Sequence, residues 1–159
     1  MIVRPATPSD APAMTALQNE IIAIGGTTAY QQPRQEHELR EDYITAPEAI
    51  CCHVALDEGG LIGFQAVGRW PGLPEGWADI GTFVSPSRQR SGAGAALFAA
   101  TVRAARAAGI ITLNATIRAD NVPGLGYYAR RGFIDYGSDP AWALDDGRVV
   151  GRVNKRFDL

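Results

Sequence analysis

The sequence predicts an α/β (α+β) domain with a mixed sheet and the element order β-α-α-β-β-β-α-β-α-β-β. Three observations carry this prediction. An apolar strand ends at Ser85-Pro86, and a glycine-containing loop and an uninterrupted helical stretch follow it. A β-branched, strand-like run at 110–117 comes directly after that helix. Earlier in the chain, two strand-like runs flank Asp57-Glu58-Gly59-Gly60, which is a hairpin signal.

The other elements follow from periodicity and from turn residues. Met14, Leu17, Ile21 and Ile24 are spaced as one face of a helix, which begins near Ser9-Asp10 and stops at Gly25-Gly26. The full set of expected elements comprises strands at 2–4, 52–56, 61–67, 77–84, 110–117, 133–136 and 148–157, and helices at 9–24, 36–44, 94–109 and 121–132.

Length and composition favour one globular domain over residues 1–159. The chain is 46% hydrophobic and 20% charged, and 159 residues are enough to bury a core. A net charge of −2 gives no basic field for nucleic acid. No apolar run approaches the roughly 20 residues that span a bilayer, and the N-terminus is not a signal peptide. Because Cys51 and Cys52 are adjacent and cannot form a framework disulfide, we expect a cytoplasmic protein.

The loop after residue 84 has the features of an anion site. Gly92 and Gly94 allow backbone N–H groups to approach a ligand, and the first turn of the following helix has N–H groups without intrahelical partners. The helix dipole adds partial positive charge, and Arg88 and Arg90 add full charges. A phosphate or pyrophosphate is the expected ligand, although the glycines alone are also compatible with a plain helix start.

Three phosphate-binding motifs can be separated here. A P-loop needs Lys-Ser/Thr after its last glycine, but Ala95 and Ala96 follow Gly94, which argues against a nucleotide binder. A dinucleotide fingerprint needs a third Gly or Ala where Leu97 stands. The remaining pattern, Gln89-x-x-Gly92-x-Gly94, resembles the coenzyme A pyrophosphate loop of the GNAT acyltransferase superfamily.

A second motif strengthens this resemblance. Asn121 is followed seven residues later by Tyr128 and then by Gly132-Phe133, in the order that the superfamily shows. The resemblance implies helices on both faces of the sheet and coenzyme A between two splayed parallel strands, 82–84 and 113–116. The cofactor-binding residues that it implies are Thr82, Phe83, Val84, Gln89, Arg90, Ser91, Gly92, Ala93, Gly94 and Asn121. Asn121 is equally compatible with a helix N-cap.

A closer resemblance, to the phosphinothricin N-acetyltransferases, covers most of the chain. The matching segments are Thr27–Tyr30, Gly68-Arg69-Trp70, Thr82-Phe83-Val84, Gln89–Gly94, Asn121 and Phe157-Asp158-Leu159. The resemblance implies acetyl-CoA as co-substrate and the α-amino group of an amino acid or analogue, of the phosphinothricin or methionine sulfone/sulfoximine type, as acceptor. It also implies a homodimer.

Some segments depart from this family. They are Leu144–Val153, the loop Pro71–Gly76, and Tyr128, which stands where the herbicide enzymes have His. The resemblance therefore supports the type of reaction better than it supports the identity of the substrate. A polyamine or peptide N-terminus as acceptor stays open, as does a non-catalytic acyl-CoA-binding module.

The resemblance also implies catalytic roles. Asp79 falls where the family has a general base, and a carboxylate of ordinary pKa near 4 would act through water or after burial raises its pKa. Tyr128 would return a proton to the coenzyme A sulfur, with Tyr127 as the alternative if the helix register differs by one. A free backbone N–H near Val84 would polarise the thioester carbonyl. Asp79 and Tyr128 could instead be structural.

The acceptor pocket is the least constrained part. Tyr30 and Trp70 are candidate pocket walls, and Arg69 is a candidate for the substrate carboxylate, although packing and a solvated strand end explain them equally well. His37 and His53 lack metal-ligand spacing, so no metal is expected. An acyl-cysteine intermediate at Cys51 or Cys52 is a minor alternative.

Overall fold

A computed structural model describes all residues 1–159 and shows one seven-stranded sheet with the order β1-β2-β3-β4-β5-β7-β6. The strands are β1 (Ile2–Pro5), β2 (Ala49–Asp57), β3 (Gly60–Gly68), β4 (Trp77–Val84), β5 (Thr112–Arg118), β6 (Ile134–Asp139) and β7 (Arg152–Asp158). Neighbouring strands are antiparallel except β4 and β5, which are parallel. The predicted mixed sheet and element order are confirmed.

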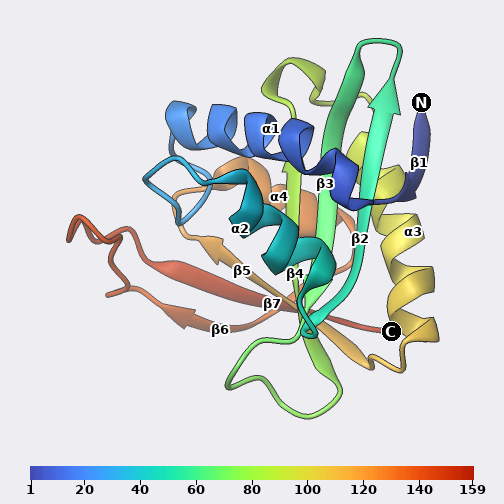
Figure 1. The fold of residues 1–159 in the computed structure, drawn as a ribbon. Helices are drawn as coiled ribbons and strands as arrows, with labels where there is room; N and C mark the ends of the chain where they lie inside the picture. The colour runs from blue at the N-terminus through green and yellow to red at the C-terminus, as the bar shows by residue number, and fades with distance from the viewer.

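Helices cover both faces of this sheet, as expected. Helices α1 and α2 lie on one face, and α3 and α4 lie on the other (Figure 1). The helices are α1 (Ala11–Ile24), α2 (Glu36–Arg40), which continues into a π turn at Glu41–Thr45, α3 (Ala93–Ala107) and α4 (Val122–Arg130). Each predicted helix is present within a few residues of its expected bounds. None is long and apolar enough to cross a bilayer.

Side-chain alternation along the strands divides the core between the two faces. Ile80 and Val67 belong to a cluster with Phe98 of α3 and Tyr128 of α4. Phe64 belongs to the other cluster, with α1 and α2 residues, and Phe83 packs against that cluster. Because successive strand residues point to opposite faces, the face of every β4 side chain follows from this division.

The parallel pair β4–β5 is joined only at its beginning. The register pairs Trp77 with Thr112, Ala78 with Leu113 and Asp79 with Asn114, and no pairing continues beyond. On its other side, β5 pairs with β7 over its whole length, from Thr112 to Arg118. The sheet therefore splits after Asp79 and Asn114. The expected split at 113–116 is corrected slightly, since Leu113 is still paired and the free part of β5 begins at Ala115.

The end of the chain differs from the expectation. We expected one strand over 148–157, but β7 begins at Arg152, and 143–149 forms a small separate hairpin with a single bridge between Ala143 and Val149. Gly151, at φ 71°, causes the break: its N–H bonds to the Trp142 carbonyl rather than to a sheet partner. β6 is correspondingly longer than the expected 133–136.

Candidate active site

The split in the sheet leaves backbone groups of β4 without strand partners. Ser85 N–H donates to the Ile62 carbonyl of β3 at 2.8 Å. Because antiparallel strands alternate hydrogen-bonded and non-hydrogen-bonded pairs, the N–H groups of Thr82 and Val84 then point away from β3, toward the split. These groups are free to pair with an extended ligand, and the N–H of Val84 is available for the predicted carbonyl contact.

The loop between β4 and α3 presents further free donors. Arg90 and Gly92 both have left-handed backbone, with φ 68° and 87°. The hydrogen bonds of this segment leave the N–H groups of Gln89, Arg90, Gly92, Gly94 and Ala95 without protein partners. Converging N–H groups at a helix N-terminus suit a pyrophosphate, so the loop fits the group that the sequence motif predicts.

The two glycines of the loop are required for different structural reasons. A Cβ on Gly92 would meet no atom within 4 Å, so this position needs glycine for its positive φ. A Cβ on Gly94 would lie 2.7 Å from the Tyr127 ring. Gly94 is therefore required by the close approach of α4 to α3.

A chain of hydrogen bonds joins the two tyrosines behind the split. The hydroxyls of Tyr128 and Thr82 are 2.9 Å apart. Gln65 Nε2 donates to Thr82 Oγ1 at 2.8 Å and to the Tyr127 hydroxyl at 3.1 Å, and Tyr127 donates to the Gly94 carbonyl at 2.8 Å. Gln65 is fully buried, and its Oε1 has no partner. The structure thus places Tyr128 beside β4 at the split, while the Tyr127 proton is engaged by Gly94.

Burial keeps both hydroxyls protonated. It raises the pKa of Tyr128 strongly, against a smaller lowering by the Thr82 hydrogen bond. It also raises the pKa of Tyr127, although the bond from Gln65 opposes the shift. A neutral phenol next to the free edge of β4 can donate to a departing thiolate, whose own pKa the same dry surroundings would raise.

Asp79 occupies the last paired rung before the split. Asn114 Nδ2 donates to its Oδ1 at 2.6 Å. Burial raises the pKa of Asp79 to about 6, and the Asn114 hydrogen bond opposes this shift. No salt bridge involves Asp79. The carboxylate is therefore ionised at neutral pH yet basic enough to accept a proton, which meets the condition set for a general base.

The two candidate proton-transfer groups lie on opposite faces of the sheet. Phe83 packs against the α1 and α2 cluster, and Asp79 shares its face by alternation. Thr82 and its partner Tyr128 lie on the α3 and α4 face. An acceptor from one side and a thiol on the other would meet at the split.

The Asn121 side chain has two protein partners. It caps α4 by accepting the Gly124 N–H at 3.0 Å, and it donates to the Thr27 carbonyl at 3.1 Å. The N-cap interpretation is confirmed. Arg118 donates to the adjacent Thr28 carbonyl at 3.0 Å, so these two side chains hold the loop after α1 against the end of β5. A coenzyme contact of Asn121 stays a prediction.

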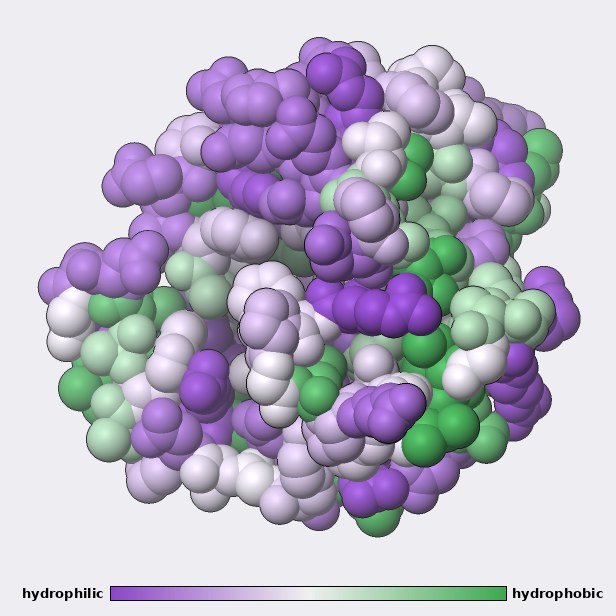
Figure 2. All heavy atoms as spheres, turned by 60° about the horizontal axis from the view of Figure 1, so that its bottom comes forward, coloured by the Kyte–Doolittle hydropathy of each residue, from purple (hydrophilic) through white to green (hydrophobic).

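The residues predicted to line the acceptor pocket make fewer interactions with the rest of the candidate site. Arg69 and Trp70 lie on the exposed loop between β3 and β4, at the bottom of Figure 1, and Trp70 is 69% exposed. Neither side chain has a hydrogen-bond partner or ion pair. Hydrophilic and hydrophobic residues mix over the face of the molecule that Figure 2 shows. Tyr30 is stacked by the Arg34 guanidinium, 4.4 Å from its ring centroid. No hydrogen bond or ion pair joins these three residues to Asp79.

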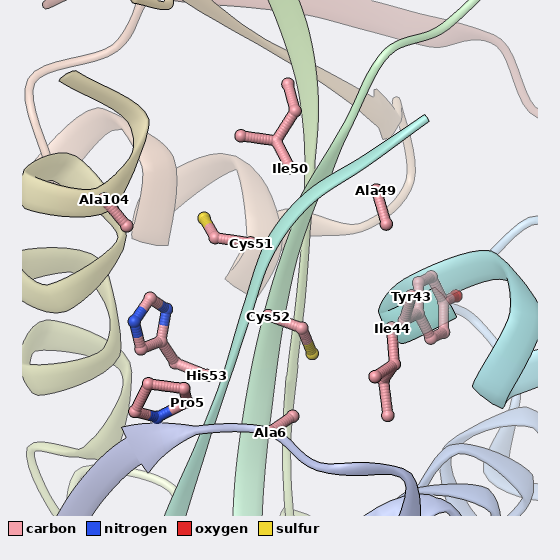
Figure 3. Close-up of a pocket in the computed structure, with 10 residues that line it drawn as sticks. All are labelled: Pro5, Ala6, Tyr43, Ile44, Ala49, Ile50, Cys51, Cys52, His53 and Ala104. Carbon is pink, nitrogen blue, oxygen red and sulfur yellow. The ribbon is translucent and has the colours of Figure 1, made fainter. Parts of the chain in front are cut away.

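A cavity of about 290 Å³ lies elsewhere, around the outer edge of β2. Figure 3 shows Cys51 and His53 pointing toward α3, and Cys52 pointing to the other side, toward Tyr43. Burial raises the thiol pKa of Cys51 to about 11 and of Cys52 to about 12. Because β3 separates these cysteines from β4 and their thiolates are scarce, the geometry gives no support to an acyl-cysteine intermediate. No cluster of three or more metal-ligating side chains is present.

Three residues of the site were missed by the sequence analysis. They are Gln65, Asn114 and Tyr136, whose hydroxyl donates to Asn114 Oδ1. The available signal was polarity inside an apolar strand: Gln65 interrupts a buried run, and Asn114 sits between Leu113 and Ala115. Tyr136 had no signal, since only the strand order brings it near β5.

Comparison with known proteins agrees with this geometry. Residues 16–133 match the family described as Acetyltransferase (GNAT) family. The chain belongs to this family. It is therefore an N-acetyltransferase, and the prediction of acetyl-CoA as co-substrate is confirmed at the level of the family. The alternative of a non-catalytic binding module is not favoured.

Individual relatives refine the comparison. The chain is 29% identical, over its whole length and 95% of the relative, to the Bacillus subtilis protein named "Putative phosphinothricin acetyltransferase YwnH". A phosphinothricin acetyltransferase from Sinorhizobium meliloti, solved in complex with acetyl-CoA, matches with a TM-score of 0.87 and 24% identity over 99% of this chain and 88% of that one. A ribosomal-protein-alanine N-acetyltransferase from Brucella melitensis matches with a TM-score of 0.89 and 21% identity over the full length of both. These two solved structures confirm the fold.

Proposed function

We propose that this GNAT enzyme transfers the acetyl group of acetyl-CoA to the α-amino group of a small amino acid or analogue. One observation carries the mechanism: a carboxylate with raised pKa, Asp79, lies on one face of the split in the sheet, and a buried neutral phenol, Tyr128, lies on the other. Direct transfer of the acetyl group needs a base beside the attacking amine and an acid beside the leaving sulfur. These two groups must lie on opposite sides of the thioester carbonyl carbon.

The proposed reaction is direct attack in a ternary complex. Asp79, or a water bound to it, takes a proton from the substrate ammonium, and the free amine attacks the thioester carbonyl carbon. The Val84 N–H polarises the carbonyl oxygen as charge develops there. The carbon–sulfur bond breaks, and Tyr128 donates its proton to the leaving sulfur. The second proton of the attacking nitrogen is released to solvent as the amide forms, and a solvent proton restores the Tyr128 phenol. The free N–H groups of Gln89, Arg90, Gly92 and Gly94 hold the pyrophosphate, with Thr82, Phe83, Ser91, Ala93 and Asn121 completing the proposed coenzyme contacts.

Two lines support an amino acid as acceptor. Both the curated relative and one of the solved structures carry the name phosphinothricin acetyltransferase. The face that Asp79 occupies also carries a cation: Arg156 of β7 pairs in register with Asn114, and its guanidinium lies 4.7 Å from the Trp77 ring centroid. A base with a cation on the same face suits a zwitterion that bears an ammonium and a carboxylate.

Arg69 and Arg156 are then competing candidates for the substrate carboxylate. Arg69 has no salt-bridge partner. Arg156 donates to Asp158 through Nε and Nη2, which leaves Nη1 free. Replacing the residue that binds the carboxylate by Ala should raise KM for amino acids but not for simple alkylamines. An equal effect on both substrates would remove that arginine from the site. Tyr30 and Trp70 are proposed as pocket walls.

The test is thiol release from acetyl-CoA across a panel of amines. Free amino acids, methionine sulfone and phosphinothricin should be acetylated faster than polyamines or peptides that begin with alanine. Higher kcat/KM for polyamines or peptides would overturn the acceptor class. With the best substrate, Asp79→Asn should lose most activity at low pH, where the free amine is scarce, and rising pH should partly restore it. A loss equal at every pH would mean that Asp79 only shapes the pocket.

We further propose a homodimer in the cytoplasm. The support is the likeness to the phosphinothricin enzymes and two free cysteines, which suit a reducing compartment. Light scattering of the purified chain checks the first point, and fractionation of expressing cells checks the second.

A further inference from the structure

We propose that Asn114 and Tyr136 are positioning residues for the general base, and that they act as a hydrogen-bonded chain, Tyr136 to Asn114 to Asp79. The inference rests on the proposed function of Asp79. Neither residue was assigned a role by the sequence motifs, and both come from strands outside the coenzyme loop.

Only one orientation of the Asn114 side-chain amide satisfies all of its hydrogen-bond partners. Its two Nδ2 hydrogens go to Asp79 Oδ1 at 2.6 Å and to Thr116 Oγ1 at 3.0 Å, while its Oδ1 accepts from the Tyr136 hydroxyl. Asn114 is 2% exposed, so water cannot replace these partners freely. Turning the amide over would set Oδ1 against the Asp79 carboxylate, two acceptors facing each other. Tyr136 opposes that turn by donating to Oδ1.

Tyr136 reaches this place by the ordinary alternation of side chains along β6. Ile134 pairs in register with Arg156, and Arg156 with Asn114, so Ile134 and Tyr136 lie on the face of the sheet that carries Asn114. The register between β6 and β7 shifts between Asp135 and Gly137, so Tyr136 is also the extra residue of a bulge. The Tyr136 ring then packs edge-on against Trp77 of β4, with ring centroids 5.4 Å apart. The hydroxyl is therefore held by packing as well as by its hydrogen bond.

Few other polar groups surround Asp79, so the hydrogen bonds from Tyr136 through Asn114 are the main polar interactions of its carboxylate. On β3, the paired residue is Gly68, which has no side chain. The titratable and charged groups nearby are Tyr136 on β6, Tyr128 on α4 and Arg156 on β7; Arg156 is engaged by Asp158, and no cation pairs with Asp79. Asn114 is the only side chain that donates to the Asp79 carboxylate. Anything that loosens Asn114 must therefore change the stability of the ionised form.

The informative variant is Tyr136→Phe, which removes the hydroxyl and keeps the ring against Trp77. A weakened Asn114 donor stabilises the carboxylate less, so the acid limb of the pH profile of kcat/KM should move upward by about half a pH unit. On the plateau above the acid limb, where Asp79 is ionised in both proteins, kcat/KM should fall about 3- to 10-fold because the carboxylate is less well positioned, with KM for acetyl-CoA unchanged. Tyr43→Phe is the matched control: its hydroxyl contacts Gln18 and Arg34 in the α1 and α2 layer, and its loss should leave the acid limb in place.

A double-mutant cycle separates positioning from general loosening. Asn114→Ala should move the acid limb upward by itself, and Tyr136→Phe should then add nothing. If the two shifts add fully, Tyr136 does not act through Asn114 and the proposal is overturned. Should Asn114→Ala fail to fold, the Asp79→Asn background serves instead. There, Tyr136→Phe should leave the remaining pH profile unchanged, and a further shift would overturn the proposal.

A direct titration distinguishes this inference from the proposed function. The carboxyl carbon of Asp79, followed by NMR in the substrate-free protein, should titrate at higher pH in Tyr136→Phe. An unchanged titration overturns the positioning role. A titration that moves while the kcat/KM profile stays fixed supports the hydrogen-bonded chain, but it overturns Asp79 as the base.

Discussion

The Tyr127 hydroxyl donates to the carbonyl of Gly94 at 2.8 Å, and its ring fills the space where a Gly94 Cβ would lie. This contact ties α4 to the first turn of α3, next to the loop proposed to bind pyrophosphate. The two glycines of one sequence motif therefore serve different purposes. Gly92 provides left-handed backbone, and Gly94 provides room for an aromatic ring.

Gly92→Ala should act on coenzyme binding more than on folding. Its side chain meets no neighbouring atom, but φ 87° costs a non-glycine residue about 1–2 kcal/mol. We expect the loop to relax and to lose its converged N–H groups, so that acetyl-CoA affinity falls about tenfold, or about 1.4 kcal/mol. Calorimetric titration measures the affinity, and unaltered binding by a folded variant would remove the loop from the site.

Gly94→Ala should act on folding first. The added methyl group meets the Tyr127 ring at 2.7 Å, and overpacking of this kind costs about 1–3 kcal/mol. Urea denaturation should show the loss, and Gly94→Ala should cost less in a Tyr127→Ala background, where the ring is gone. If Gly94→Ala costs as much in that background as in the wild type, the clash is not the cause.

Tyr128→Phe should lower kcat by roughly 10- to 1000-fold, within the range of general acid catalysis, and leave acetyl-CoA binding nearly unchanged. Tyr127→Phe is the matched variant on the neighbouring residue. It loses the bonds to Gly94 and Gln65, so stability should fall by about 1–2 kcal/mol while kcat changes less. Steady-state kinetics and urea denaturation separate the two. The reverse ranking of kcat would make Tyr127 the donor.

Most helices and strands, and the part of the site built from the loop before α3, could be predicted from residues that are close together in the sequence. The strand–loop–helix unit around Gly92 and the helix at Asn121 depend on residues close in sequence, and both are where the motifs predicted. The closing strands were placed less well. Gly151 breaks the expected run because its N–H turns to Trp142, a contact that no periodicity reveals.

The supports of Asp79 could not be predicted for a topological reason. Tyr136 approaches Asn114 because β7 and β6 follow β5 in the sheet order and because alternation along β6 puts both side chains on one face. The tyrosine pair shows a second limit. A helical wheel sets Tyr127 and Tyr128 about 100° apart. Their ring centroids nevertheless lie 5.0 Å apart, and both hydroxyls belong to one hydrogen-bond network that includes Gln65. Tertiary contacts determine both the position of Tyr136 and the pairing of the two tyrosines.

Asp10 should contribute to acid sensitivity. The bidentate hydrogen bonds from Arg4, both 2.8 Å, lower its pKa to about 2. A lowered carboxyl pKa stabilises the fold above the unfolded value near 3.8, and this contribution is lost as the pH falls toward 2. Arg4 is 40% exposed and solvent screens the pair, so Asp10→Asn should cost about 1–2 kcal/mol at pH 7.

The cost of Asp10→Asn should shrink as the pH approaches 2. Urea denaturation at several pH values measures it. Glu58→Gln, at the exposed hairpin tip, is the control that should cost little throughout. A cost for Asp10→Asn that does not depend on pH would show that the charge of Asp10 is not what stabilises this contact.

Asp79→Asn should make the enzyme more stable at neutral pH while it loses activity. Burial holds the folded-state pKa at about 6, above the unfolded value near 3.8. Between these values the folded chain keeps a proton that the unfolded chain has released, so the free energy of unfolding of the wild type declines as the pH rises through this window and levels off above it. The decline amounts to at most about 3 kcal/mol.

Asparagine at position 79 carries no charge to desolvate, and its carbonyl can still accept the Asn114 hydrogen bond. The gain in stability over wild type should therefore be small near pH 4, grow through pH 6, and reach about 1–3 kcal/mol at pH 7.5. Urea denaturation at pH 4.5 and 7.5 measures both ends of the window. A gain that is the same at both pH values, or a loss at pH 7.5, would contradict a buried carboxylate with raised pKa. A gain confined to the higher pH would show that this position is held at a cost in stability, which is the pattern of a base kept for catalysis.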